Sequence, residues 1–342
     1  MAVAKRVTIS DIARLAGVST GAVSFALNDR PGVSEATRQR ILEIAEELQW
    51  QPSSAARALV GGSTGVIGLA ISRPARTIGS EAFFADLIAG IQSGVSSSQM
   101  GLQMWLVRDV QAEIDTYRRW HNSRQVDGVI MVDPLLDDPR TAALTELGTP
   151  AVIIGSRPSR PGEPPTAWVD DTQAAATLFD YLVAIGHRDM AYVSGPAALE
   201  HTLLRTQVLR DLESEGVAQE SFVTDYSPAH ASAITRQLLS RRRRPSVIVY
   251  DNDVLAVAGL RVAQEMGVGV PQDISIASFD DSVIAGLTHP SITCLTRDTF
   301  ELGEQAARLL LAQLKSGTPL ESLACPPPVL TVRESTVPPA SR

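Results

Sequence analysis

The sequence predicts an all-α segment at the N-terminus, followed by a larger α/β core built on parallel sheets. Within residues 7–60, apolar residues recur at helical spacing, and Ser or Thr precedes each helical run. From about residue 63 onward, short apolar runs alternate with amphipathic helical stretches, as in sheets covered by helices. The length of 342 residues favours two or three domains, and 44% hydrophobic residues are enough to form their cores.

The first helix is expected to begin after Thr8 and to end at Gly17. The Thr8 hydroxyl can cap the helix, and Asp11, three residues on, faces the free backbone N–H groups of the first turn. Its apolar face is expected to comprise Ile12, Leu15 and Ala16.

The second and third helices follow the same pattern. Ser19 is expected to cap a helix from Thr20 to about Leu27, and Ser34 to cap a third helix after the loop at residues 28–32. Their inward-facing positions are expected to be Val23, Leu27, Ile41, Ile44, Ala45 and Leu48. Two helices joined by a tight, glycine-containing turn and supported by a third form a helix-turn-helix unit.

The predicted second helix suits the major groove of DNA. The small polar residues at its exposed start are Ser19, Thr20, Gly21 and Ser24. Small side chains let a helix sit deep in the groove, and hydroxyls with helix N-terminal N–H groups suit phosphate oxygens. The first forty residues hold six cationic and three acidic side chains, a net charge of +3, whereas the whole chain carries −8. A small helical bundle with ordinary surface charge is the alternative.

This segment resembles the DNA-binding headpiece of the LacI-type, or lactose-repressor, family of bacterial transcription regulators. The matching residues are Val7-Thr8-Ile9, Asp11-Ile12-Ala13, Ala16-Gly17-Val18-Ser19, Val23-Ser24, Leu27-Asn28, Val33-Ser34, Thr37-Arg38, Ile44-Ala45 and Glu47-Leu48. The DNA contacts that the resemblance implies are Thr8, Ser19, Thr20, Gly21, Ser24, Phe25, Asn28, Ser34 and Arg38. The family often has Thr at the position of Ala22 and Arg at that of Phe25. Phe25 can touch a thymine methyl but cannot make a bidentate guanine contact, which leaves the operator sequence open.

The stretch from Pro52 through Ala56-Arg57-Ala58-Leu59 resembles the family's hinge helix. In the family this helix folds on DNA, pairs with its dimer mate and pushes a leucine into the minor groove, which kinks the duplex. Leu59 stands at that position, and Ala56 is expected to contact DNA beside it; the alternative is that Leu59 packs under the core. The expected domains are therefore a headpiece at residues 1–51, a hinge helix and linker at 52–62, and a core at 63–342.

The core is expected to hold two lobes, because about 280 residues is large for a single sheet. The strand-like runs are Val66–Ile71, Leu102–Val107, Gly128–Val132, Ala151–Ile154, Met190–Val193, Val247–Tyr250 and Ile274–Phe279, with helical stretches such as Phe83–Val95, Thr172–Ile185 and Asp253–Met266. Ligands of such sheets bind at the carboxyl ends of the strands. The polar residues at those ends are Arg73, Asp133, Arg157, Asp251-Asn252-Asp253 and Asp280-Asp281.

The core also resembles the family's effector-binding core, which is similar to periplasmic sugar-binding proteins. The matching residues are Phe83-Phe84, Gly186-His187-Arg188, Arg205, Asn252-Asp253, Ala256, Val270-Pro271, Asp273-Ile274-Ser275, Phe279-Asp280-Asp281, His289-Pro290 and Thr293. The resemblance implies two doubly wound parallel-sheet lobes of periplasmic-binding-protein type, closing on a small ligand, often a sugar. It also implies a repressor homodimer whose affinity for a pseudo-palindromic double-stranded operator is set by that ligand.

The effector-binding residues that the resemblance implies are Phe83, Arg205, Tyr226, Asn252 and Asp280. Alternatives remain at several positions. Phe83 or Phe84 can belong to the core, and Asp253 and Asp281 can cap helices rather than bind a ligand. Arg73 and His201 are weaker candidates for the cleft, and Val208 replaces a family glycine near Arg205.

Other classes of protein are disfavoured. No run of eighteen apolar residues and no secretion signal is present, so we expect a cytoplasmic protein without a membrane anchor, unlike a periplasmic solute-binding protein. The motifs of nucleophilic and phosphate-binding enzymes are missing, so no enzyme activity and no cofactor are expected.

Cys294 and Cys325 are expected to be free thiols, and the five scattered histidines have no metal-binding spacing. The arginines at 241–244 are expected to end a helix, and the proline-rich C-terminal end carries no leucine heptad for tetramerisation.

Overall fold

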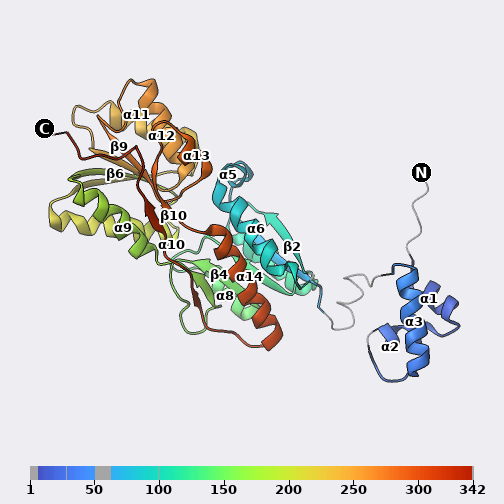
Figure 1. Ribbon diagram of the computed structural model, residues 1–342. Coiled ribbons are helices and arrows are strands. Elements are labelled where there is room, and N and C mark those ends of the chain that lie inside the picture. Colours follow the sequence, from blue (N-terminus) through green and yellow to red (C-terminus); the bar gives the residue numbers. More distant parts are fainter. Residues whose placement is uncertain (1–6, 28, 51–62, 99, 341–342) are drawn as a thin grey trace. The chain divides into compact units, whose positions relative to one another are not determined.

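The structure, a computed structural model, describes residues 7–27, 29–50, 63–98 and 100–340. These residues divide into two compact units, one before and one after the bond between Thr64 and Gly65 (Figure 1). The predicted hinge residues Ala56 and Leu59, and the predicted DNA contact Asn28, lie outside the described residues.

In the described part of the first unit lie three helices, each of which begins where the sequence predicts. They are α1 (Ile9–Ala16), α2 (Thr20–Leu27) and α3 (Glu35–Glu47). The backbone N–H and the hydroxyl of Thr8 both donate to the Asp11 carboxylate, at 3.0 and 2.7 Å, and α1 ends at Gly17 with a φ of 68°. The backbone N–H of Ala22 donates to Ser19 Oγ at 3.2 Å, and that of Thr37 donates to Ser34 Oγ at 3.3 Å, so each hydroxyl satisfies a free donor at a helix start.

The core of this unit confirms the predicted helix faces with one exception. The buried apolar residues are Ile12, Ala13, Ala16, Val23, Ala26, Ile41 and Ala45, with Leu27, Ile44 and Leu48 packed against them. The prediction for Leu15 is wrong, because its side chain is 46% exposed. Ala13 is buried instead, and two residues advance about 200° around a helix, so Leu15 lies on the opposite side from Ala13.

The second unit consists of two α/β lobes, each with its own sheet (Figure 1). The strands of the first lobe are β1 (Val66–Ile71), β2 (Gly101–Leu106), β3 (Gly128–Met131), β4 (Ala151–Gly155), β5 (Thr166–Trp168) and β11 (Leu323–Ala324), in the order β11-β5-β4-β3-β1-β2. Its helices are α5 (Ala75–Ser80), α6 (Ala82–Ser96), α7 (Val110–Asn122), α8 (Pro139–Leu147) and α14 (Thr299–Ser316).

The second lobe repeats this plan. Its strands are β6 (Asp189–Ser194), β7 (Ala218–Val223), β8 (Val247–Tyr250), β9 (Ser275–Ser278), β10 (Thr293–Thr296) and β12 (Val329–Thr331), in the order β12-β10-β9-β8-β6-β7. Its helices are α9 (Asp171–Ala184), α10 (Glu200–Asp211), the 3-10 helix η1 (Leu212–Glu215), α11 (Pro228–Leu239), α12 (Asp253–Glu265) and α13 (Val283–Leu287). The strand pairs are parallel, as predicted, except that the edge strand β12 runs antiparallel to β10.

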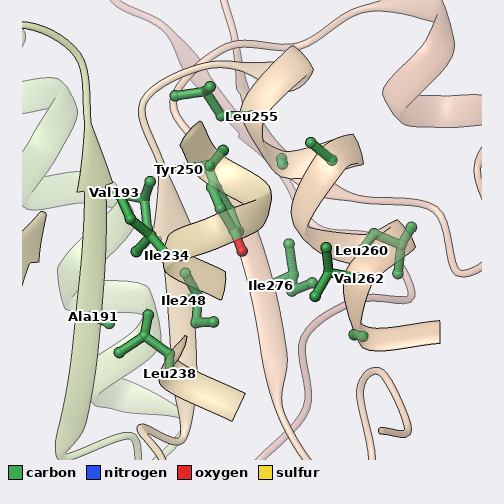
Figure 2. Close-up of a cluster of buried hydrophobic side chains, with 14 of the residues drawn as sticks. Ala191, Val193, Ile234, Leu238, Ile248, Tyr250, Leu255, Leu260, Val262 and Ile276 are labelled. Carbon is green, nitrogen blue, oxygen red and sulfur yellow. The ribbon is translucent and has the colours of Figure 1, made fainter. Parts of the chain in front are cut away.

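Helices cover both faces of each sheet, so adjacent residues of a central strand pack into different clusters. In the second lobe, Val193 of β6 lies in the cluster under α11 and α12, which Figure 2 shows, with Ile234, Leu238 and Leu260. The neighbouring Tyr192 packs on the other face, against residues of α9 and α10. This alternation follows from the twofold period of a strand.

The chain passes from one lobe to the other after β5, after β10 and after β11. Asp171 follows the first of these passages and Arg297 stands at the second, so both lie between the two sheets. The carboxyl ends of the central strands of both sheets face the same cleft, which is where open parallel sheets bind ligands.

Both cysteines, Cys294 and Cys325, are free thiols, as predicted. Among the described residues, no helix is long and apolar enough to cross a membrane. The same part of the chain holds no group of three or more His, Cys, Asp or Glu residues placed to bind a metal ion.

Candidate functional site

The first candidate surface is the exposed start of α2. Ser19, Thr20 and Gly21 are exposed, Ser24 is half-buried, and the Phe25 side chain is 41% exposed. A Cβ atom added at Gly21 would meet only Ser19 Oγ, at 3.7 Å. The backbone at this end of α2 is therefore open to a close approach by another molecule.

Two of the predicted DNA contacts also hold the loop that follows α2. The Phe25 ring lies against Gly32, where an added Cβ would come within 3.2 Å of it. The Arg38 guanidinium pairs with Asp29 and donates to the Arg30 carbonyl at 3.0 Å. Arg38 is thus engaged within the unit, whereas Thr8 and Ser34 stand exposed at the starts of α1 and α3.

The second candidate site is a cleft between the two lobes of the core, with about 640 Å³ of space that is partly open to solvent. Four of the five predicted effector residues line it, namely Phe83, Arg205, Tyr226 and Asp280. Other polar residues on its walls are Arg73, Glu81, Asp133, Ser156, Asp171, His201, Asp251 and Arg297. Side chains that are far apart in the sequence therefore meet in one polar cavity.

The fifth predicted effector residue, Asn252, does not line the cleft. Its side-chain oxygen accepts a hydrogen bond from the Leu255 N–H at 2.9 Å and so caps α12. The cap was predicted for its neighbour Asp253, which is instead the first residue of the helix. The cap uses the Asn252 oxygen, whereas its Nδ2 atom is buried and has no hydrogen-bond partner among the described residues.

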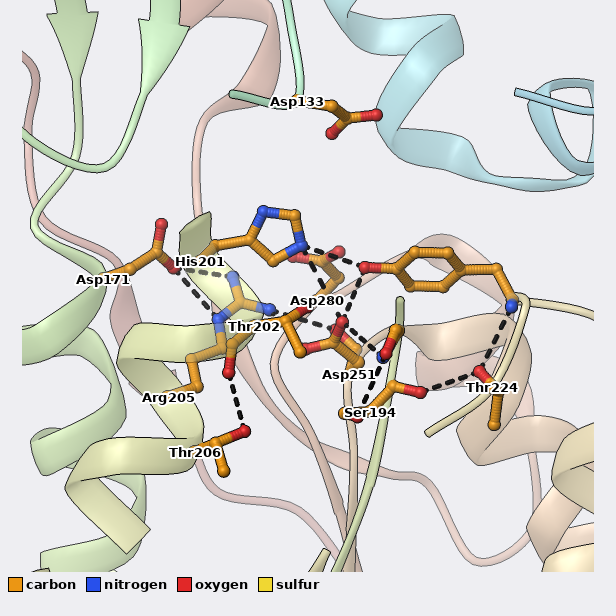
Figure 3. Close-up of polar contacts among 12 residues, drawn as sticks. Asp133, Asp171, Ser194, His201, Thr202, Arg205, Thr206, Thr224, Asp251 and Asp280 are labelled. Carbon is orange, nitrogen blue, oxygen red and sulfur yellow. Dashed lines mark hydrogen bonds and ion pairs between the residues drawn. The ribbon is translucent and has the colours of Figure 1, made fainter. Parts of the chain in front are cut away.

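Arg205 lies at the centre of the floor of the cleft, between two buried carboxylates (Figure 3). Its Nε and Nη2 donate to Asp171 Oδ1 at 3.0 and 2.6 Å, and its Nη1 donates to Asp251 Oδ1 at 2.7 Å. Burial alone would raise the pKa of both carboxyl groups, but the Arg205 guanidinium lowers both pKa values well below the usual range. Both aspartates are therefore ionised in the folded protein.

Tyr226 is fixed at the wall of the same cleft. Its hydroxyl donates to Asp251 Oδ2 at 2.6 Å, and His201 Nε2 lies 2.9 Å from the hydroxyl oxygen. Because the Tyr226 hydrogen goes to Asp251, the hydroxyl oxygen can accept a hydrogen from His201 Nε2. Burial, with the nearby Arg205, lowers the pKa of His201. A Cβ at Gly195 would come within 2.0 Å of the tyrosine ring, so only glycine leaves room for it.

The first lobe contributes a second set of charges opposite this network. Arg73 Nε donates to Asp133 Oδ2 at 2.8 Å, and the Arg73 guanidinium lies 4.1 Å from the centre of the Tyr226 ring. This cation–π contact joins the two lobes across the cleft. Burial raises the pKa of the neighbouring Glu81 to about 8, although Arg73 partly opposes the shift.

Asp133 and Tyr226 have left-handed backbones, with φ of 53° and 63°. Residues other than glycine adopt this conformation at a cost of roughly 1–3 kcal/mol, and such strain gathers at binding and catalytic sites. Both residues line the cleft, so the strain lies where the ligand is expected.

Three charged residues of the cleft were not predicted from the sequence, namely Glu81, Asp171 and Arg297. Asp171 and Arg297 follow the short strands β5 and β10, which were not predicted, so the rule of strand ends could not be applied to them. Glu81 lies between α5 and α6 and follows no strand. Two strand-end candidates lie elsewhere: Arg157 pairs with Glu200 at 2.7 Å, and Asp281 pairs with Arg333 at 2.6 Å.

Comparisons with known proteins find two family models in the chain. Residues 8–53 match the model of bacterial regulatory proteins of the lacI family, and residues 179–336 match that of a periplasmic binding protein-like domain. The transcriptional regulator CelR of Thermobifida fusca is 30% identical over 321 residues, which cover 92% of this chain and 94% of CelR.

Solved structures agree with the sequence comparison. A complex of the transcriptional regulator CelR with cellobiose aligns with a TM-score of 0.72 at 27% identity, covering 97% of this chain and 100% of that one. The lac repressor dimer bound to operator and an anti-inducer aligns with a TM-score of 0.82 at 25% identity, with the same coverage. With its helix-turn-helix unit, its two-lobed core and these relatives, the chain belongs to the LacI family of bacterial regulatory proteins.

Proposed function

We propose that this protein is a cytoplasmic homodimeric repressor of carbohydrate uptake or catabolism genes, whose affinity for a pseudo-palindromic operator is set by a sugar or sugar derivative in the interlobe cleft. The observation that carries the proposal is the convergence of Phe83, Arg205, Tyr226 and Asp280 on one polar cleft, in a chain that also has a helix-turn-helix unit. A sugar presents many hydroxyl groups and apolar ring faces, which suit charged hydrogen-bonding groups beside aromatic rings.

In this proposal residues 1–51 bind DNA, residues 52–62 form the hinge, and residues 63–342 bind the effector and the second subunit. The start of α2 enters the major groove, because its residues are small, polar and exposed. The net charge of +3 in the first forty residues supplies attraction to phosphate within an acidic chain.

A homodimer is supported by an exposed apolar patch on α13. Val283, Ile284 and Leu287 are 78%, 60% and 79% exposed on this short helix. Contiguous exposed apolar side chains mark interaction surfaces, and a twofold operator calls for a twofold protein. The lac repressor, which is similar to this chain, is a dimer in its operator complex.

The DNA-binding part of the proposal is tested by gel shift of the full chain on fragmented genomic DNA from the source organism. We expect a few fragments to be retained selectively at moderate salt and to contain an inverted repeat. Retention of all fragments with equal affinity, or of none at low salt, would contradict the proposal.

The variant Leu59→Ser should weaken binding of the selected fragment by about 1–3 kcal/mol while non-specific binding changes little, if this leucine kinks the minor groove.

A further inference from the structure

Each lobe places an arginine beside a carboxyl side chain in the cleft. Both pairs include buried atoms that have no hydrogen-bond partner among the described residues. In the first lobe, Arg73 Nη1 and Glu81 Oε1 lie 3.8 Å apart, and their side chains are only 9% and 6% exposed. Neither atom has a hydrogen-bond partner among the described residues. Buried polar atoms are nearly always bonded, so these two indicate the position of a missing partner.

The second pair is Arg297 and Asp280. Arg297 Nε lies 3.4 Å from Asp280 Oδ1, and the Arg297 side chain is 10% exposed. Its Nε and Nη2 have no hydrogen-bond partner in the described part of the chain. Burial raises the pKa of Asp280, which shows that Arg297 and Arg205 do not fully compensate the carboxylate.

The remaining charges of the cleft are already satisfied. Arg205 uses three nitrogen atoms on Asp171 and Asp251, and Asp251 also accepts from the Tyr226 hydroxyl and the Gly195 N–H. A ligand that competed for these groups would have to break short, buried bonds. Among the described residues that line the cleft, the buried side-chain atoms without a hydrogen-bond partner are Arg73 Nη1, Glu81 Oε1, and Nε and Nη2 of Arg297, on opposite walls of the cavity.

A guanidinium N–H beside a carboxylate oxygen matches two adjacent hydroxyl groups. One hydroxyl accepts from the arginine while its neighbour donates to the carboxylate, which satisfies both protein atoms at once. An anionic group fits less well, because five carboxyl side chains face three guanidinium groups around the cleft. If Glu81 is protonated at neutral pH, as its raised pKa of about 8 indicates, four charged carboxylates still outnumber the three cations.

Building on the proposed function, we infer that the effector is a neutral sugar held at both ends, with one pair of adjacent hydroxyls on Arg73 and Glu81 and another on Arg297 and Asp280. Because the pairs belong to opposite walls, a ligand that engages both holds the two lobes in one arrangement. Ligands that reach only one pair lose this effect, so the distance between the two hydroxyl pairs decides which sugars act.

The inference is tested by calorimetry on the full chain with three kinds of probe. These are the neutral disaccharides cellobiose, maltose and lactose, the anionic sugars glucose 1-phosphate and glucose 6-phosphate, and adenine, which has no hydroxyl group. We expect at least one neutral disaccharide to bind, and each sugar phosphate to bind about tenfold more weakly or not at all. Sugar phosphates that bind as tightly as the best disaccharide would overturn the inference.

Variants of the paired residues test which side chains contribute to binding of the sugar. Glu81→Leu keeps the volume of the side chain and removes its acceptor atoms, and Arg297→Gln removes the second guanidinium. Each should weaken the best disaccharide by about tenfold or more, because a hydrogen bond to the sugar is lost and the buried partner of the removed group stays unsatisfied. Arg73→Gln should do the same, and Arg108→Gln, at a side chain that is 85% exposed, is the matched control with unchanged affinity. If Glu81→Leu and Arg297→Gln fold with the wild-type melting temperature and bind like wild type, the two-pair site is wrong.

The failure of this inference differs from the failure of the proposed function. If no neutral sugar binds at millimolar concentration while the same preparation still selects operator DNA, the inference is overturned and the DNA-binding regulator stands. If adenine binds and the sugars do not, the sugar effector of the proposed function fails together with the inference.

Discussion

At the scale of single residues, Arg205 does more than present hydrogen-bond donors to a ligand. It is 3% exposed, and its three bonding nitrogens all contact Asp171 or Asp251. Both carboxylates are buried and depend on this guanidinium for their low pKa. We therefore regard Arg205 first as the group that makes the charged floor of the cleft stable.

Arg205→Ala is expected to destabilise the core by about 3–5 kcal/mol, because it leaves two buried carboxylates without their cation. Arg210→Ala, at an exposed position on the same helix, is the matched control and should change stability by less than about 0.5 kcal/mol. Urea unfolding of the full chain, followed through the transition of the core, measures both. If the two variants unfold at the same urea concentration, Arg205 does not stabilise the core by neutralising the buried carboxylates. Asp280→Asn is then the cleaner probe of ligand recognition.

Glu81 should make stability depend on pH. Burial raises its pKa from 4.5 to about 8, Arg73 lowers it in part, and Asp133, Asp280 and Asp253 raise it further. Folding therefore takes up a proton at this residue, so its contribution to stability is complete below about pH 4.5 and is lost as pH rises through 8. Wild type should lose stability relative to Glu81→Gln across this range, by at most about 1.4 kcal/mol per pH unit.

The measurement is a pair of urea titrations at several pH values, with Glu146→Gln on the exposed face of α8 as the control. The difference between wild type and the control should stay constant. A flat difference for Glu81→Gln as well would mean that Glu81 is ionised in the folded protein, as it is in the unfolded chain.

At the scale of secondary-structure elements, the start of α2 depends on small residues. Gly21 is exposed, and an added Cβ would have ordinary contacts only. Gly21→Ala should therefore keep or raise the stability of the N-terminal unit by up to about 1 kcal/mol. Gly21→Leu should fold equally well but weaken operator binding by about tenfold or more, because the larger side chain prevents close approach to the groove. Operator affinity is measured by fluorescence anisotropy with a labelled operator, and Gln39→Leu on α3 is the control. Equal operator affinities of the two leucine variants would contradict this prediction.

The exposed patch on α13 gives a second prediction at this scale. Leu287→Asp should shift the proposed dimer toward monomer by about 30-fold or more, the cost of roughly 2 kcal/mol if this residue lies centrally in the interface. Val223→Asp replaces a comparably apolar side chain, 49% exposed at the edge strand β7, and should leave the dimer intact. Sedimentation equilibrium distinguishes them, and a Leu287→Asp protein that stays fully dimeric would place the interface elsewhere.

The sequence predicts the elements that depend mainly on interactions between residues close together in the chain. Each helix of the N-terminal unit begins at a Ser or Thr that bonds the first turn, and the buried central strands are apolar runs. The strands that escaped prediction are short or lie at edges: β7 reads Ala-Gln-Glu-Ser-Phe-Val with its polar side in solvent, and β5 has only three residues. A run of this length or polarity carries too little apolar signal to be separated from a loop.

The same limit applies to the candidate site. Arg205 and Asp280 could be named because they follow recognisable elements or match the family, whereas Arg297 follows an unpredicted strand and Glu81 follows none. Which of Asn252 and Asp253 caps α12 depends on the backbone, because Asn252 has an extended φ of −144° and Asp253 already belongs to the helix. Two adjacent residues with capping side chains cannot be ranked from their identities alone.

At the scale of the whole core, contacts of several kinds join the lobes across the cleft. Arg73 lies on the Tyr226 ring, Arg157 pairs with Glu200, and Leu135 forms an isolated β-bridge with Leu199. A ligand can change the balance between lobe arrangements only by its difference in affinity for them. The two unused charge pairs on opposite walls supply such a difference, because a ligand satisfies both only in the arrangement that brings the walls together.

We expect occupation of this cleft to change the affinity of the protein for DNA. The most direct test titrates a selected operator with the full chain, with and without the best-binding neutral disaccharide, for wild type and Asp280→Asn. We predict a change of about fivefold or more in operator affinity for wild type, and unchanged affinity without response to the sugar for Asp280→Asn. If wild-type operator affinity is identical with and without a sugar known to be bound, the cleft does not regulate DNA binding.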